Sequence, residues 1–256
     1  MDLSPGSEEE VLKTEPVRKL SIVVLTRNEG NSIGAVLREI LAKVKNPFEI
    51  LVVDDSTDDT ARIVQAFSSV HSNIRLRPQE GRGYTRALTT AVKYFEGDAM
   101  VVLVGDGSDE IADIDRMSEK MQEGYDLVCA SRYMRGGARA RGASVQSFFS
   151  SLVCKSLKMA LGINTCDVSN SFKLYRRELL SRIEIKDSGF AASMQITLKS
   201  FFQGCRIAEI PTIWRNRGAG SSKFRFRRHA THYLYWYVWA VLKGIAVRIP
   251  FKGASR

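Results

Sequence analysis

The stretch AMVVLVGDGSDE, residues 99–110, begins as a continuous apolar run and ends in glycine, serine and acids. An apolar run bounded by turn residues predicts a buried parallel strand. The acids fall at the carboxyl end of that strand, where open α/β sheets bind their ligands. Asp106 is therefore placed to hold a hard divalent cation that bridges nucleotide phosphates. The same residues also fit a simpler interpretation, a tight turn with an Asx cap on the next helix.

Apolar runs and helical periodicity alternate along the chain. Strands are predicted over 20–26, 48–53, 74–77, the apolar part of 99–110, 126–130, 171–175 and 207–213. Helices are predicted over about 33–44, 60–68, 87–95, 111–123, 144–161 and 193–203, the first capped by Asn31 or Ser32. This order predicts an α/β fold with a Rossmann-like, doubly wound, mainly parallel sheet. Pro211 predicts that the strand at 207–213 lies at a sheet edge.

Charge is unevenly distributed along the chain. The 256 residues carry a formal net charge of +10, which favours anionic partners. No Asp or Glu occurs from Trp214 to Arg256. The four cysteines lack metal-ligand spacing and are expected to be small buried thiols. The acidic N-terminal residues predict no signal peptide, and no apolar run reaches the length that spans a bilayer.

Acids also follow two earlier predicted strands, as Glu29 and as Asp54 and Asp55. The carboxyl ends of parallel strands meet at one sheet edge, so these acids and those at 106 and 109 predict a nucleotide and metal site. The chain lacks the P-loop and dinucleotide glycine motifs, so acids rather than a glycine cradle would hold the nucleotide. Alternatively, Asp54 and Asp55 cap the following helix. Nucleic acid is not expected as a partner, because these acids would repel its phosphates.

Short motifs follow this framework in a fixed order. They are LTRNE at 25–29, VVDDS at 52–56, GRG at 81–83, VGD at 104–106, ASRY at 130–133, DVSNSFKLY at 167–175 and RGAGSSK at 217–223. Each motif is weak alone, but together they resemble the family-2 glycosyltransferases of GT-A fold. The chain is most similar to the dolichol-phosphate mannose synthase branch, which moves a sugar from a nucleotide sugar to a polyprenyl phosphate.

The resemblance implies roles for individual residues. Asp106 would bind Mg or Mn and, with Arg132, would be catalytic. The implied donor-binding residues are Leu25, Arg27, Glu29, Val53, Asp55, Gly105, Asp106, Ser108, Arg132, Arg217 and Lys223. Arginine forks, lysine charges and the metal would together stabilise charge on the departing nucleoside diphosphate.

Three positions depart from the family pattern. Val104 replaces the first acid of the D-x-D motif, which leaves Asp106 as the direct protein ligand, with Asp109 or Glu110 helping through water. Arg27 replaces a tyrosine, and Gln195 stands where the mannose synthases usually have glutamate. The last two changes leave the donor open between a UDP-sugar and a GDP-sugar.

The implied reaction is an inverting, metal-dependent transfer to a polyprenyl or dolichyl phosphate. A phosphate acceptor is already anionic near neutral pH, so it needs no strong general base. Two alternatives remain. A saccharide hydroxyl acceptor would need a carboxylate base, for which Asp109 or Asp167 are candidates, and a catalytically inert relative would bind nucleotide sugars without turnover.

The C-terminal residues interleave Tyr and Trp with Lys and Arg. From this pattern we expect 224–256 to form a basic, aromatic, amphipathic segment at a membrane surface. The polar, acidic residues 1–19 are expected to form a flexible tail, and the family resemblance implies a GT-A domain over 20–223. An ordinary core helix is the alternative for 229–242. The expected protein is peripheral, at the cytoplasmic face of a membrane, with a homo-oligomer or a membrane-protein partner as further expectations.

Overall fold

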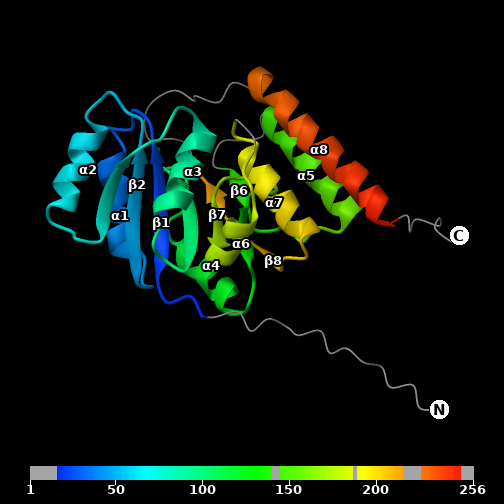
Figure 1. Ribbon diagram of the computed structural model, residues 1–256, viewed down its shortest axis with the longest axis horizontal. Coiled ribbons are helices and arrows are strands. Elements are labelled where there is room, and N and C mark those ends of the chain that lie inside the picture. The colour runs from blue at the N-terminus through cyan, green and yellow to red at the C-terminus, as the bar shows by residue number, and fades with distance from the viewer. Residues whose placement is uncertain (1–15, 140–144, 187–188, 216–225, 249–256) are drawn as a thin grey trace, which may run out of the picture.

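The computed structural model describes residues 16–139, 145–186, 189–215 and 226–248 (Figure 1). The strands are β1 (Leu20–Thr26), β2 (Phe48–Asp54), β3 (Ile74–Pro78), β4 (Ala99–Val104), β5 (Leu127–Ser131), β6 (Ala138–Arg139), β7 (Lys173–Arg176), β8 (Ile207–Pro211) and β9 (Ile213–Trp214). The helices are α1 (Ile33–Lys43), α2 (Thr60–Ser68), α3 (Tyr84–Tyr94), α4 (Asp113–Gln122), α5 (Val145–Leu161), α6 (Arg177–Arg182), α7 (Ala192–Phe202) and α8 (Phe226–Arg248).

A seven-stranded sheet in the order β3-β2-β1-β4-β7-β5-β8 forms the centre of the fold. All neighbouring pairs are parallel except those of β7, which runs antiparallel to both β4 and β5. The predicted mainly parallel sheet is therefore confirmed, and Pro211 does lie in an edge strand. The carboxyl ends of β1, β2 and β4 fall in register, since Leu25 pairs with both Val53 and Val104.

Two apolar cores form because both faces of the sheet are covered. Strand β1 is buried along its whole length. Its residues alternate, with Val23 and Leu25 in the core beneath α3, α5, α7 and α8, and Ile22 and Val24 in the core beneath α1, α2 and α4. Each fully buried Val or Leu contributes about 1.5–3 kcal/mol. This two-sided burial explains why the strands read as continuous apolar runs.

Helix α8 packs on α5 and α7 at one end of the molecule (Figure 1). Trp236 and Ala240 belong to the main core, and a Cβ at Gly244 would overlap Leu161 of α5, so glycine permits the close approach. The alternative prediction, an ordinary core helix over 229–242, is therefore correct for the side of α8 that packs on α5 and α7. The other side leaves Leu234 and Leu242 each 61% exposed. Within the described residues, no helix is both long and apolar enough to cross a bilayer.

Several local features differ from the sequence-based expectations. Strand β7 enters the sheet between β4 and β5, a short helix α6 follows it directly, and β6 and β9 form a separate two-stranded sheet. Short apolar runs carry no information on strand direction, which is fixed by tertiary pairing. Ser32 occupies the N-cap position of α1, but its hydroxyl makes no cap hydrogen bond and instead donates to the Gly105 carbonyl at 2.7 Å.

Candidate functional site

The loops after β1 and β2 are joined by side-chain hydrogen bonds. The Asn28 N–H donates to the Ser56 hydroxyl at 2.7 Å, and the Asn28 side-chain oxygen accepts the Thr57 N–H at 2.8 Å. Asn28 has a φ of 54°, a left-handed conformation that asparagine tolerates. The Asp54 carboxylate accepts the Thr26 hydroxyl at 2.6 Å. These contacts hold the two strand ends together as one surface.

The residues predicted to bind the nucleoside lie at this surface or directly beneath it. Leu25 and Val53 are buried at adjacent strand positions, and the Arg27 Nε is 3.8 Å from the Asp55 carboxylate. The Glu29 N–H donates to the hydroxyl of Thr60, the first residue of α2, at 2.9 Å. The alternative that Asp54 or Asp55 caps α2 is wrong, because Asp59 occupies the N-cap position and makes no side-chain cap bond.

Gly105 connects β4 to the loop after β1. Its N–H donates to the Leu25 carbonyl at 3.0 Å. A Cβ at Gly105 would lie 2.6 Å from the Thr26 methyl carbon and 3.5 Å from the Glu29 Cγ. This position therefore requires glycine for close packing against β1, which brings the Asp106 turn beside the joined ends of β1 and β2.

Asp106 lies in a compact turn at the end of β4 and is 2% exposed. Its carboxylate accepts the Ser108 N–H at 3.0 Å, and Gly107 adopts a φ of 73°. The Asx turn expected from the simpler interpretation is thus present. The cap on the next helix is not, because α4 begins at Asp113 after an N-cap residue, Ala112, that makes no side-chain cap bond.

A second buried acid lies close to this turn. Asp109 accepts the Val104 N–H at 3.1 Å. Burial raises the pKa of the Asp109 carboxyl to about 7, and the neighbouring Asp106 charge adds to the rise, while Arg132 opposes it. Asp109 is therefore within electrostatic reach of both Asp106 and Arg132.

The acidic turn fits a cation that is shared with phosphates better than one enclosed by protein. No group of three or more His, Cys, Asp or Glu in the described parts of the chain is arranged to hold a metal. Mg²⁺ commonly takes one or two carboxylates, with phosphates and waters completing its shell. Asp106, with Asp109 behind it, supplies that donor set at a strand end.

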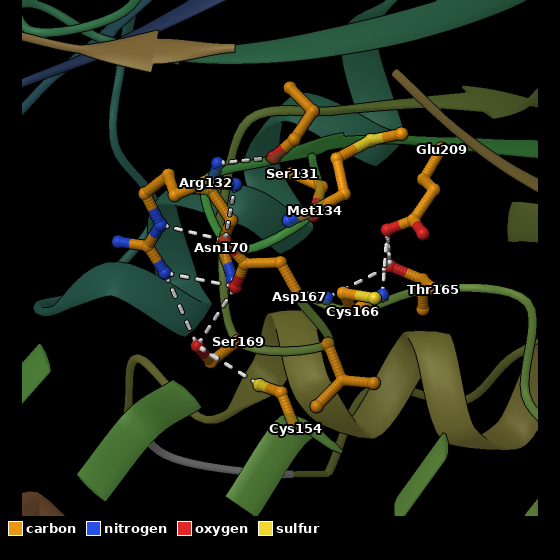
Figure 2. Close-up of polar contacts among 12 residues, drawn as sticks. Ser131, Arg132, Met134, Cys154, Thr165, Cys166, Asp167, Ser169, Asn170 and Glu209 are labelled. Carbon is orange, nitrogen blue, oxygen red and sulfur yellow. Dashed lines mark hydrogen bonds and ion pairs between the residues drawn. The ribbon is translucent and has the colours of Figure 1, made fainter. Parts of the chain in front are cut away.

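Arg132, just past β5, forms a buried ion pair with Asp167 (Figure 2). The Arg132 Nε donates to Asp167 Oδ2 at 2.7 Å and Nη2 donates to Oδ1 at 3.0 Å. The Arg132 backbone N–H also donates to Oδ2, at 3.1 Å. Burial alone would raise the pKa of the Asp167 carboxyl, but the Arg132 charge and hydrogen bonds outweigh burial and lower it. Asp167 is 0% exposed and ionised, so the structure contradicts its candidacy as a general base.

The loop that carries Asp167 is fixed from several sides. The buried Lys173 Nζ donates to the carbonyls of Val168 and Asn170. The Asn170 amide donates to the Ala130 carbonyl at 2.7 Å. From β8, the Glu209 carboxylate accepts the Cys166 N–H at 2.6 Å. Residues 165–170 are thus tied to β5, β7 and β8.

The structure brings most of the predicted site residues together, and the others lie outside the described residues. Strands β1, β2 and β4 place the nucleoside residues and the acidic turn at one edge. Ser108 joins them, 2% exposed, with its carbonyl accepting the Arg215 N–H at 2.8 Å. The predicted phosphate ligands Arg217 and Lys223 lie outside the described residues.

Two features of the site were missed from sequence. The motif at 167–175 contained Asp167 and Lys173, but nothing in it revealed that Asp167 pairs with Arg132 or that Lys173 ties down the loop that carries Asp167. Tyr84 was also missed; its hydroxyl lies 2.9 Å from the Ser193 hydroxyl. Burial raises the pKa of Tyr84 to about 12, with a further contribution from the Asp109 charge. Its position directly after the GRG loop at 81–83 was the available signal.

Curated relatives match most of the chain. The dolichol-phosphate mannosyltransferase of Pyrococcus furiosus is 27% identical over 236 residues, covering 85% of this chain and 64% of that protein. The undecaprenyl-phosphate 4-deoxy-4-formamido-L-arabinose transferase of Klebsiella pneumoniae is 27% identical, covering 85% and 66%. The dolichyl-phosphate hexose transferase of Haloferax volcanii is 28% identical, covering 80% and 86%. The chain thus spans less than two thirds of the first two relatives.

Solved structures share the fold. Glucosyl-3-phosphoglycerate synthase from Mycobacterium tuberculosis, crystallised with Mn²⁺, UDP and glucosyl-3-phosphoglycerate, superposes with a TM-score of 0.65 at 20% identity, covering 93% of this chain and 83% of that one. The predicted GT-A fold is confirmed in its mixed, mostly parallel α/β architecture. The family model described as glycosyl transferase family 2 matches residues 21–184, well over half of the sequence. The chain belongs to glycosyl transferase family 2.

Proposed function

We propose that this protein transfers a sugar, with inversion, from a UDP- or GDP-sugar to a polyprenyl or dolichyl phosphate. The observation that carries the proposal is that one site contains both a buried carboxylate turn, at Asp106, and a buried guanidinium, at Arg132. The charges of both residues act on Asp109, which lies between them in the sequence. One group suits a cation on a nucleoside diphosphate, and the other suits a phosphate. The curated relatives, named as transferases to dolichyl and undecaprenyl phosphates, support the same acceptor class.

On the donor side, the ends of β1 and β2 would receive the nucleoside, with Leu25 and Val53 buried beneath it, Asp55 beside it, and Arg27 and Glu29 at the rim. Asp106 would hold Mg or Mn; when bound, the cation neutralises charge that develops on the departing diphosphate. Gly105 and Ser108 shape the backbone beside the diphosphate. Arg217 and Lys223 are proposed to contact it as well.

On the acceptor side, the chain's own residues favour a phosphate over a sugar hydroxyl. A hydroxyl acceptor needs a base, and Asp167 is engaged by Arg132. A phosphate oxygen is already ionised near neutral pH and can attack the anomeric carbon without proton transfer. Asp109 remains the one candidate base named from sequence, and the saccharide-acceptor alternative depends on it.

We also propose that the outer side of α5 and α8 rests on the membrane that holds the acceptor. Large apolar side chains there are between 45% and 86% exposed, namely Phe148, Leu152, Met159, Leu234, Tyr235, Val238, Leu242, Ile245 and Val247. Neither helix contains an acid. Apolar contact combined with positive charge favours anionic lipid surfaces.

A transfer assay tests the reaction. The protein is incubated with UDP- and GDP-sugars, with Mn²⁺ or chelator, and with undecaprenyl phosphate, undecaprenol or a free saccharide as acceptor. We expect product only with the lipid phosphate and only with metal. Product with a saccharide, or nucleotide binding without any product, would favour one of the two alternatives.

Sedimentation with vesicles tests the membrane surface. We expect binding to phosphatidylserine-containing vesicles and its loss in the double variant Leu234→Glu and Leu242→Glu. Val70, 77% exposed just after α2, provides the matched control, and Val70→Glu should bind like the wild type. Equal loss in both variants would argue against a docking role for α8.

A further inference from the structure

The Arg132 guanidinium has one edge fully engaged and one edge open. Its Nε and Nη2 donate to the two carboxylate oxygens of Asp167, and Nη2 also donates to the Ser169 hydroxyl at 3.3 Å. Nη1 has no hydrogen-bond acceptor among the described residues, and Figure 2 shows it pointing away from Asp167. We propose that Asp167 is a positioning residue that presents this open edge of Arg132 to the acceptor phosphate. The inference rests on the proposed function.

Asp167 is itself held too firmly to follow a moving arginine. Besides the arginine donors, its Oδ1 accepts the Ser169 hydroxyl and the Asn170 N–H, each at 3.2 Å. Its own N–H donates to the Thr165 hydroxyl at 3.1 Å. With both carboxylate oxygens saturated on a loop tied to three strands, the carboxylate fixes the plane and direction of the guanidinium.

The charge of this cluster also favours an anion at the open edge. The charges of Arg132 and Asp167 cancel, and the Lys173 Nζ donates to two carbonyls in the same buried region, although burial lowers the pKa of Lys173. The Arg132 side chain is 13% exposed, so an incoming phosphate would meet it with little competing water. An ion pair in such surroundings interacts more strongly with a third charge than it would in water.

Pre-orientation is what Asp167 would contribute. A free arginine side chain must surrender rotamer freedom to bind a phosphate with its planar fork, and a fixed one has already done so. Misplacement of a catalytic group by about 1 Å can cost about 100-fold in rate. Loss of Asp167 should therefore act through Arg132 and affect the acceptor, while the nucleoside surface on β1 and β2 is left unchanged.

A double-mutant cycle with a soluble acceptor probe tests this. Binding of farnesyl phosphate, with farnesol as control, is measured by calorimetry for wild type, Asp167→Asn, Arg132→Lys and the double variant. We expect Asp167→Asn to weaken binding at least about tenfold, the scale of one hydrogen bond to a charged group. In the Arg132→Lys background the same change should cost less than about twofold. In Asp167→Asn, the affinity for UDP or GDP should stay unchanged. In turnover assays of the same variant, the acceptor KM should rise by a larger factor than kcat falls.

A second variant covers the risk that Asp167→Asn folds poorly. Ser169→Ala removes a contact to both Arg132 and Asp167 without leaving a buried charge, and should weaken farnesyl phosphate binding in the same direction by a smaller factor. Wild-type affinity in both variants, or equal losses in both backgrounds of the cycle, would overturn the positioning role while the proposed function stands. A wild-type protein that binds no farnesyl phosphate would overturn the proposed function itself.

Discussion

The two sides of the site hold their charges in different ways. On the β1, β2 and β4 side, the carboxylates of Asp54, Asp106 and Asp109 are held by hydroxyls and backbone N–H groups. On the β5 and β7 side, the Asp167 carboxylate is held by a guanidinium. The contacts described for the first arrangement come from neutral donors, and we propose that a bound cation meets its negative charge. In the second arrangement the Asp167 carboxylate is paired with Arg132 within the protein, and one edge of the Arg132 guanidinium is open to an anion.

The largest expected effect comes from breaking the second arrangement. Arg132→Met leaves the Asp167 carboxylate buried without its cation, so we expect the free energy of unfolding to fall by about 3–5 kcal/mol in urea titrations. Adding Asp167→Asn to Arg132→Met removes the buried charge, so the double variant should recover part of the lost free energy of unfolding. Arg62→Met is the control, because its pair with Asp59 is exposed, and its urea midpoint should match that of the wild type.

A second test removes charge from the first arrangement and keeps its shape. Asp106→Asn can still accept the Ser108 N–H, so the thermal midpoint should stay close to that of the wild type. Transfer activity should fall by about 100- to 1000-fold, the scale of losing one electrostatic stabiliser of the transition state. Activity within about threefold of the wild type would mean that Asp106 is a turn residue only.

The close approach of β1 and β4 can be broken by a single methyl group. In Gly105→Ala, the added carbon must displace Thr26, and we expect a loss of about 1–3 kcal/mol in stability together with weaker nucleotide binding. Gly34→Ala in α1 is the matched control, since its Cβ would lie 3.6 Å from Ile63 and alanine favours the helix. Equal stability of both variants would contradict this account of Gly105.

A fourth effect depends on pH. Since the pKa of Asp109 is raised to about 7, the folded protein binds more protons than the unfolded chain between about pH 4 and 7. Its contribution to stability therefore falls as pH rises through that window, by at most about 1.4 kcal/mol per pH unit. In chelator-treated buffer, Asp109→Asn should be more stable than the wild type at pH 8, and the gap should close towards pH 4.

If that gap is the same at every pH, Asp109 is not buried beside Asp106 as described. The result would also remove the second acid from the account of the metal site, which would then depend on Asp106 alone.

Local sequence patterns predicted the strand ends of the first half and most elements of both halves well, but they did not predict how the second half is assembled. The acids after β1, β2 and β4 were found because parallel strands of continuous apolar residues place their following loops at one edge. The Arg132–Asp167 pair was not found, because the two residues are 35 positions apart and meet only through the antiparallel insertion of β7. Similarly, the aromatic residues of the C-terminal segment were predicted to face a membrane, whereas Trp236 of α8 packs in the core.

The most direct test of the account is a thermal-shift titration with UDP, GDP, UDP-sugars and GDP-mannose, with and without Mn²⁺. We predict that one nucleotide class raises the melting temperature selectively, only with the metal, and that Asp106→Asn abolishes the shift. No shift from any nucleotide, or a shift that is independent of both metal and Asp106, would contradict the assignment of this edge as the donor site.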